Sequence, residues 1–209
     1  MNEYHKIHSV FKRDRETNKF TPEFTCPEFE YLADKEWLWT EKIDGTNVRI
    51  MWDGENIRYG GRTDRANIPV KLLDALNALF LNKKEVFISK FGTTPVCLYG
   101  EGYGAGIQKC GGGYRHDNSF ILFDVLIGRW WLRRDDVCDM AETLDIDVVP
   151  LVGSGTIQEA INLVTEGFTS SVPKDGKLIA EGLVLRPAVE LLDRAGRRII
   201  TKLKHRDFK

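Results

Sequence analysis

Two runs with strand character flank residues 41–47. The stretch 37–39 is mainly apolar, and Val48 to Trp52 places an apolar side chain at every second position, as in a half-buried strand. Asp44 and Gly45, which lie between the two runs, suit a tight turn. The pattern therefore predicts two strands joined by a short connection, with Lys42 where the first strand ends.

Similar patterns predict the other elements. Apolar residues at helical spacing indicate helices at 69–81 and 133–144, and a capping-box pair, Thr156 and Glu159, predicts the start of another. In the first helix the residues expected to face the core are Val70, Leu73, Leu76, Leu79 and Phe80. Further strands are expected at 56–61, 96–100, 120–126, 130–132, 147–152, 181–187 and 199–204. The segment 120–126 is almost wholly apolar and is expected to be a central strand buried on both faces.

Length and composition limit the class of protein. With 209 residues, 42% of them hydrophobic, the chain can bury one substantial core, so we expect one domain over 1–209, with 1–36 as its N-terminal strand and loop extension. No run of about 18 apolar residues predicts a membrane span. The polar N-terminus has no signal-peptide core, and the four cysteines lack paired spacing. We therefore expect free thiols and a cytoplasmic location, which would be the host cytoplasm for a viral protein.

The charge balance argues against a protein that coats nucleic acid non-specifically, because the net charge is -1. Thirty basic residues still allow a local basic groove. Near the N-terminus Lys12, Arg13 and Arg15 form a basic cluster in a segment where Ile7, Ser9 and Phe11 alternate with basic neighbours. This segment fits either a solvated hairpin and loop or an opening strand whose cations touch a polynucleotide.

Taken alone, a lysine such as Lys42 is usually a surface charge. The full segment 41–47, Glu-Lys-Ile-Asp-Gly-Thr-Asn, resembles the nucleotide-binding motif of the covalent nucleotidyltransferases, the superfamily of DNA ligases, RNA ligases and mRNA capping enzymes. It is most similar to the RNA ligase 2 type, which includes the RNA-editing ligases. The resemblance implies that Lys42 forms a phosphoramidate with a nucleoside monophosphate. It also implies nucleotide contacts for Glu41, Ile43 and Asn47.

The other motifs of this superfamily follow in order along the chain. The resemblance implies these roles: Arg62 near the nucleotide phosphates, Glu101 at the ribose, Phe123 stacked on the purine, Glu181 holding a divalent metal, and Lys202 with Lys204 gripping the α-phosphate. Phe120 is the second candidate for stacking. Strict alternation along a strand would put Phe123 and Asp124 on opposite faces. Each of these residues has a plain structural alternative, but the ordered set favours the superfamily.

The resemblance implies an α+β fold: a nucleotidyltransferase, ATP-grasp-like adenylation domain with two antiparallel β-sheets flanking a nucleotide cleft and helices outside. The implied activity is that of an ATP-dependent RNA ligase, using Mg²⁺ or Mn²⁺, with Lys42, Lys202 and Lys204 as catalytic residues. Lys42 would attack ATP to give lysyl-AMP, AMP would pass to a 5′-phosphate end, and a 3′-hydroxyl would displace it. The expected substrate is RNA ends or a nicked duplex, with DNA left open.

Two alternatives to a minimal RNA ligase remain open. The chain stops at Lys209, just after the last motif, where larger relatives continue into a further domain. It is therefore expected to be a minimal RNA ligase, a minimal ATP-dependent DNA ligase, or an adenylyltransferase core that needs a partner domain. We expect a monomer, with a protein partner left open. A capping guanylyltransferase and a nucleotide-binding module without ligation are disfavoured by the motif context and by the complete set of charged residues.

Overall fold

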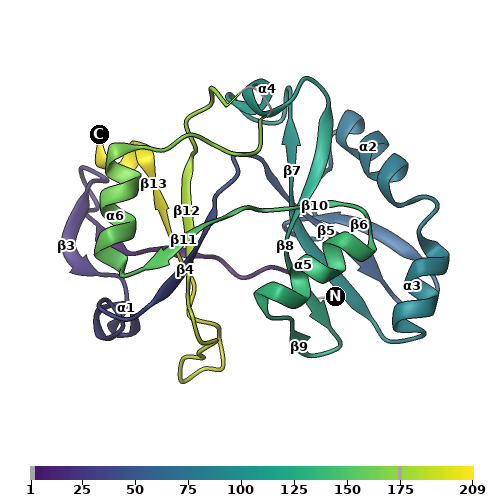
Figure 1. Ribbon diagram of the computed structural model, residues 1–209, viewed down its shortest axis with the longest axis horizontal. Helices are drawn as coiled ribbons and strands as arrows, with labels where there is room; N and C mark the ends of the chain where they lie inside the picture. The colour runs from purple at the N-terminus through teal and green to yellow at the C-terminus, as the bar shows by residue number, and fades with distance from the viewer. Residues whose placement is uncertain (1–2, 174–175) are drawn as a thin grey trace. The chain divides into compact units, whose positions relative to one another are not determined.

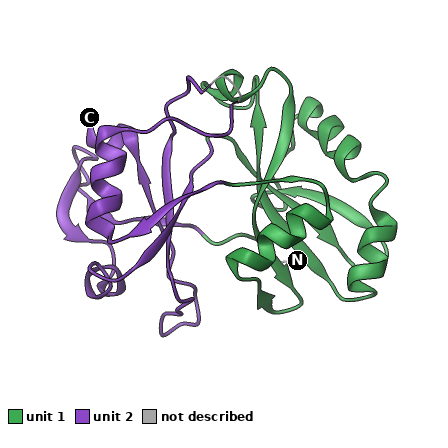
Figure 2. Ribbon diagram, viewed as in Figure 1, with its two compact units in different colours: residues 1–5, 44–149 green, residues 6–43, 150–209 purple. Residues whose placement is uncertain are grey.

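The computed structural model describes residues 3–173 and 176–209 (Figure 1). The chain forms two compact units (Figure 2). Unit 1 comprises residues 1–5 and 44–149, and unit 2 comprises residues 6–43 and 150–209. The assignment of the whole chain to one domain stays a prediction.

Unit 1 is built on a six-stranded sheet in the order β10-β8-β7-β5-β6, with β9 paired to β8. Its strands are β5 (Thr46–Trp52), β6 (Ile57–Gly61), β7 (Val96–Gly104), β8 (Asn118–Ile127), β9 (Trp130–Trp131) and β10 (Asp147–Val148). Its helices are α2 (Val70–Phe80), α3 (Lys84–Phe91), α4 (Gly111–Tyr114) and α5 (Arg134–Thr143). One face of the sheet, carrying Val48, Leu98 and Leu122, joins α2, α3 and α5 in a single hydrophobic core.

Unit 2 is built on a five-stranded sheet in the order β1-β13-β12-β4-β11. Its elements are β1 (His8–Ser9), β2 (Phe11–Arg13), β3 (Phe20–Phe24), α1 (Pro27–Tyr31), β4 (Trp37–Glu41), β11 (Leu151–Gly155), α6 (Ile157–Glu166), β12 (Gly182–Pro187), β13 (Thr201–Lys204) and the 3₁₀ helix η1 (His205–Phe208). Alternate residues of β4 and β12, including Trp37 and Leu183, pack against Ile157 and Val164 of α6. The predicted capping box of Thr156 and Glu159 starts this helix.

The predicted α+β class with two main sheets is confirmed. Most strand pairs are antiparallel, but β1 pairs parallel to β13 and β10 pairs parallel to β8. A separate hairpin joins β2 and β3. The single strand expected at 147–152 was wrong, because the chain leaves the sheet of unit 1 after Val148 and enters the sheet of unit 2 at Leu151.

Two details of the predicted core also differ. Val70 and Leu73 of α2 are exposed, whereas Leu72 is fully buried. Leu72 packs where β7 has Gly102, since a Cβ at that glycine would lie 2.4 Å from the leucine side chain. The face of α2 is thus set by a glycine far away in sequence, which helical spacing cannot reveal.

Within the described residues, none of the helices combines the length and the apolar character that crossing a membrane requires.

Candidate active site

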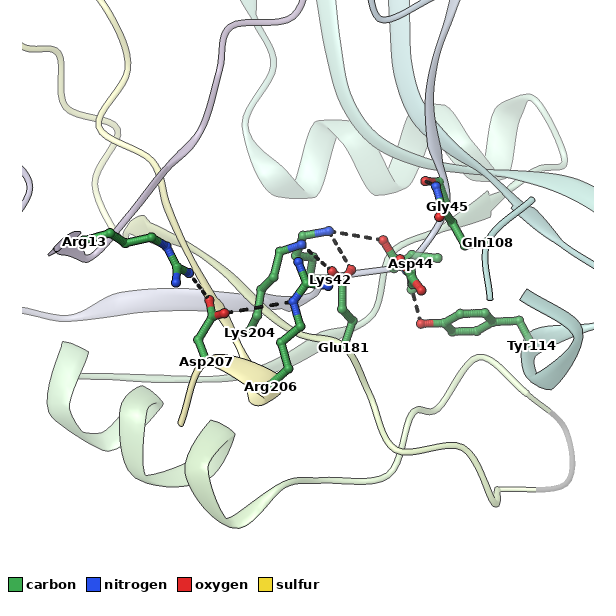
Figure 3. Close-up of polar contacts among 11 residues, drawn as sticks. Arg13, Lys42, Asp44, Gly45, Gln108, Tyr114, Glu181, Lys204, Arg206 and Asp207 are labelled. Carbon is green, nitrogen blue, oxygen red and sulfur yellow. Dashed lines mark hydrogen bonds and ion pairs between the residues drawn. The ribbon is translucent and has the colours of Figure 1, made fainter. Parts of the chain in front are cut away.

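Lys42, Glu181 and Lys204 form an ion cluster in unit 2 (Figure 3). The Lys42 Nζ lies 2.6 Å from Oε2 of Glu181, and the Lys204 Nζ lies 2.7 Å from Oε1 of the same carboxylate. All three side chains are mostly buried, with Glu181 only 12% exposed. One buried anion is therefore shared by two cations.

The backbone of β4, β12 and β13 sets this geometry. β12 pairs with both other strands, and the Lys42 N–H donates to the Gly182 carbonyl at 2.9 Å. Gly182 pairs with Lys204, and a Cβ at Gly182 would lie 2.0 Å from the Leu203 carbonyl oxygen. Glycine at this position permits the close approach of the strands, which brings Glu181 between the two lysines.

The electrostatics of the cluster follow from burial and neighbouring charge. Burial acts to raise the pKa of Glu181, but the charges and hydrogen bonds of Lys42 and Lys204 outweigh it, so the pKa lies below its ordinary value. Burial, and then the positive charges of Lys204 and Lys42, lower the pKa of Lys202 to about 8. Lys202 and Lys204 lie two residues apart on β13 and share a face, as the sequence predicts.

Glu41 and Ile43, the neighbours of Lys42, are buried. The Glu41 carboxylate accepts hydrogen bonds from the Ser170 hydroxyl and from the Ser171 N–H, and burial raises its pKa. Sequence patterns did not predict these serines, because they lie about 130 residues further along the chain. The nucleotide contacts expected of Glu41 and Ile43 stay predictions.

In unit 1, Asn47 and Glu101 lie directly opposite each other on β5 and β7. They lie on the face away from the hydrophobic core, since their neighbours Val48 and Gly100 pair on the core side. The buried Asn47 Oδ1 has no hydrogen-bond partner among the described residues. This orphaned acceptor beside a carboxylate suits a ligand with hydroxyl or amino donors.

Arg62 follows the last residue of β6, Gly61, which pairs with Val48. The Arg62 side chain is exposed and forms no ion pair with any of the described residues. Glu101 lies within β7, which continues beyond the strand that we expected at 96–100, because Gly100 leaves room for the Phe120 ring and Gly102 for Leu72. Phe120, the second candidate for stacking, is part of the core.

Phe123 lies at a β-bulge. β7 and β8 pair Gly100 with Leu122 and Tyr99 with Asp124, so Phe123 is the extra residue between two pairs. The Tyr4 ring packs edge-on against Phe123 with centroids 5.1 Å apart, and the Tyr4 hydroxyl donates to Asp124 Oδ2 at 2.8 Å. The expectation that Phe123 and Asp124 point to opposite faces was wrong, because a bulge interrupts the alternation. Sequence reasoning also missed Tyr4.

No cluster of three or more His, Cys, Asp or Glu side chains that would hold a metal occurs among the described residues. A magnesium ion in a nucleotide site needs only one or two carboxylates, together with waters and substrate phosphates. Glu181 meets this requirement, since its two oxygens already neutralise two cationic groups.

A family model described as RNA ligase matches residues 35–204. The chain belongs to the RNA ligase family. No curated protein sequence matches it. The predicted family is therefore confirmed, on a match that includes every motif from Lys42 to Lys204.

Solved structures show the same fold. A variant of Naegleria gruberi RNA ligase with ATP and Mn is 17% identical, with a TM-score of 0.65 over 97% of this chain and 57% of that one. Another variant with ATP and Mn is 16% identical, with a TM-score of 0.68 over 98% of this chain and 56% of that one. The same ligase with PPi is 17% identical, with a TM-score of 0.65, covering 97% and 57%. The chain thus spans less than two thirds of these ligases.

Proposed function

We propose that this chain is an ATP-dependent RNA ligase that seals 3′-hydroxyl and 5′-phosphate ends through a lysyl-AMP intermediate on Lys42. The observation that carries the proposal is the buried ion cluster, in which the Lys42 Nζ lies 2.6 Å from a carboxylate that also binds Lys204. The membership of the chain in the RNA ligase family supports it, as does the likeness to a ligase solved with ATP and Mn and with AMP and Mn.

In the first step the Lys42 Nζ attacks the α-phosphorus of ATP. A P–N bond forms, the P–O bond to the leaving group breaks, and pyrophosphate departs. The amine must be neutral to attack, whereas a free lysine with a pKa near 10.4 is protonated at neutral pH. Lys42 is paired with Glu181, and its proton must pass to solvent before the attack.

Glu181 is the residue that would hold a divalent cation, Mg²⁺ or Mn²⁺, which when bound supplies charge neutralisation at the α-phosphate. Lys202 and Lys204 both lie close to Lys42. The same two lysines stabilise negative charge on the α-phosphate as pyrophosphate leaves.

Unit 1 supplies nucleoside recognition in this proposal. Phe123 stacks on the adenine, and Asn47 and Glu101 bind ribose hydroxyls through their oxygens. Arg62 is exposed and has the planar donor array that suits phosphate. In the later steps AMP moves to a 5′-phosphate of the RNA, and the 3′-hydroxyl then attacks that phosphate and releases AMP.

The test combines adenylylation and sealing. Purified protein is incubated with Mg²⁺ and α-labelled ATP, and then with a 5′-phosphorylated nick whose 3′-hydroxyl strand is RNA or DNA. The proposal predicts labelled protein, labelled 5′ ends and sealing with the RNA 3′-hydroxyl.

Lys42→Ala should abolish the label, whereas Lys35→Ala, at an exposed position in the same unit, should retain it. Label on Lys42→Ala equal to that of the unchanged protein would overturn the mechanism. Sealing with DNA 3′-hydroxyl ends alone would overturn the RNA assignment. Labelled protein without any sealing would assign the chain as an adenylyltransferase core.

A further inference from the structure

A basic groove of about 700 Å³ lies within unit 2, beside the lysine pair of β13. β1, β2, β13 and η1 contribute its lining. Its cationic lining residues are Lys6, Lys12, Arg13, Lys202, Lys204 and Arg206. Two of them, Lys202 and Lys204, belong to the proposed catalytic site, and the other four have no role in the function proposed above.

The positive charge of this groove is only partly compensated. The acidic residue among the described lining is Asp207, which lies 2.5 Å from Arg13 and 4.0 Å from Arg206 (Figure 3). Lys6 and Lys202 form no ion pair with any residue that the structure describes. Glu23 pairs with Lys12, and Glu181 pairs with Lys204. Three carboxylates thus offset the six cations, and the remaining positive charge is suited to a polyanion.

Repulsion among these cations contributes to a lowered pKa at two lining residues, Lys202 and His8. Burial and then Lys204 and Lys42 lower the pKa of Lys202, and Lys6 adds to the shift. Burial, Lys6, Lys202 and Arg197 lower the pKa of His8, which also lines the groove. A bound anion would relieve this repulsion.

We propose that the groove binds the phosphate backbone of an RNA strand whose end is being joined. The inference rests on the proposed function and deepens it, because it assigns the polynucleotide path within unit 2. The cations are not confined to the lysine pair of β13: they continue to Lys12 and Arg13 on β2 and to Arg206 on η1. A single-stranded backbone takes such a succession of cations, and Phe11 adds an aromatic surface to the lining.

The test removes two cations that lie outside the proposed catalytic site. Lys6→Ala with Arg206→Ala changes two exposed side chains. The matched control, Lys90→Ala with Arg129→Ala, removes the same charge from exposed positions of unit 1. The probe is a 5′-phosphorylated single-stranded RNA, whose binding is measured by fluorescence anisotropy over a range of salt concentrations.

The groove variant should bind the RNA about tenfold more weakly at low salt. Its log–log salt dependence should be shallower by about 0.7 for each cation removed, whereas the control should match the unchanged protein. Lys6→Arg with Arg206→Lys should restore binding, and a thermal unfolding scan should show that all variants fold. Equal losses in the groove and control variants would overturn the assignment.

A second readout separates RNA from the triphosphate of ATP. The KM for ATP in lysyl-AMP formation should be unchanged in the groove variant. A raised KM for ATP with unchanged RNA binding would show that the groove serves the triphosphate, and would overturn the proposal. Absence of lysyl-AMP in the unchanged protein contradicts the proposed function, whereas groove-dependent RNA binding is measured without ATP and stands or falls separately.

Discussion

The two sheets carry different chemistry. In unit 2 the candidate site residues are charged and paired: two lysines share Glu181 at the ends of β4, β12 and β13. In unit 1 they are an amide, a carboxylate and an aromatic ring, Asn47, Glu101 and Phe123, on the face of the sheet away from its core. In the proposed function, phosphate chemistry belongs to unit 2 and nucleoside recognition to unit 1. Substitutions in unit 2 should therefore lower the rate of adenylylation, and those in unit 1 should raise the KM for ATP.

The largest effect is expected for Glu181→Gln. This change leaves Lys42 and Lys204 facing each other without an anion and removes the proposed metal ligand. The single-turnover rate of lysyl-AMP formation should fall on the order of 10²–10³-fold. Glu190→Gln, at an exposed position of the same unit, should be unaffected. A Glu181→Gln rate within twofold of the unchanged protein would show that the ion cluster has no catalytic part.

Phe123→Ala tests the nucleoside recognition proposed for unit 1. Loss of base stacking costs about 1–3 kcal/mol, so the KM for ATP should rise by about 5- to 150-fold. The maximal rate of lysyl-AMP formation should change little, and Phe123→Tyr should behave like the unchanged protein. Steady-state adenylylation measures both constants. A fall in the maximal rate at unchanged KM would reverse the roles that we assign to the two units.

Tyr4→Phe should cost stability through the bulge in β8. The Tyr4 hydroxyl donates to the buried Asp124 carboxylate at 2.8 Å, and loss of a donor to a buried charged group costs about 1.5–3 kcal/mol. Urea unfolding should show this loss. The control, Tyr31→Phe, changes a tyrosine that is 82% exposed and should be neutral. Equal stabilities of the two variants would mean that this hydrogen bond does not stabilise the bulge.

The smallest effect is expected for Lys202→Met, and it depends on pH. The pKa of Lys202 is lowered from 10.5 to about 8 in the folded protein, so its charged form is disfavoured by folding. This cost is fully present below pH 8 and is relieved as the pH rises from about 8 to 10.5. Lys202→Met should therefore unfold at a higher temperature than the unchanged protein at pH 7, and the difference should shrink towards pH 10. A difference that grows over this range would contradict the assigned direction.

The sequence predicts most of the fold because its strands and helices follow simple periodicities. The strands that carry Lys42, Glu181 and Lys204 were expected at their observed places, since apolar residues mark each of them and their pairing brings the motifs together. The order of motifs also identified the family. Elements and motifs that a local sequence pattern marks were thus well predicted.

The exceptions depend on long-range packing. The bulge at Phe123 arises where β8 must fit β7, and Tyr4 reaches it from 119 positions away along the chain. The partners of Glu41 and the burial of Leu72 have the same origin. Such contacts leave no periodic signal, so a single sequence does not reveal them. The ion pairs of Glu181 with Lys42 and Lys204 were not predicted either. Both lysines were expected near the phosphate, but not as partners of this carboxylate.

The central claim is that Lys42 is the nucleophile, and the site of the adduct tests it most directly. The unchanged protein is incubated with ATP and Mg²⁺, digested under alkaline conditions that preserve the phosphoramidate, and mapped by mass spectrometry. The account predicts AMP on the peptide that contains Lys42, with fragment ions that place it on that side chain. AMP on Lys202 or Lys204, or no adduct on any lysine while RNA is still sealed, would contradict it.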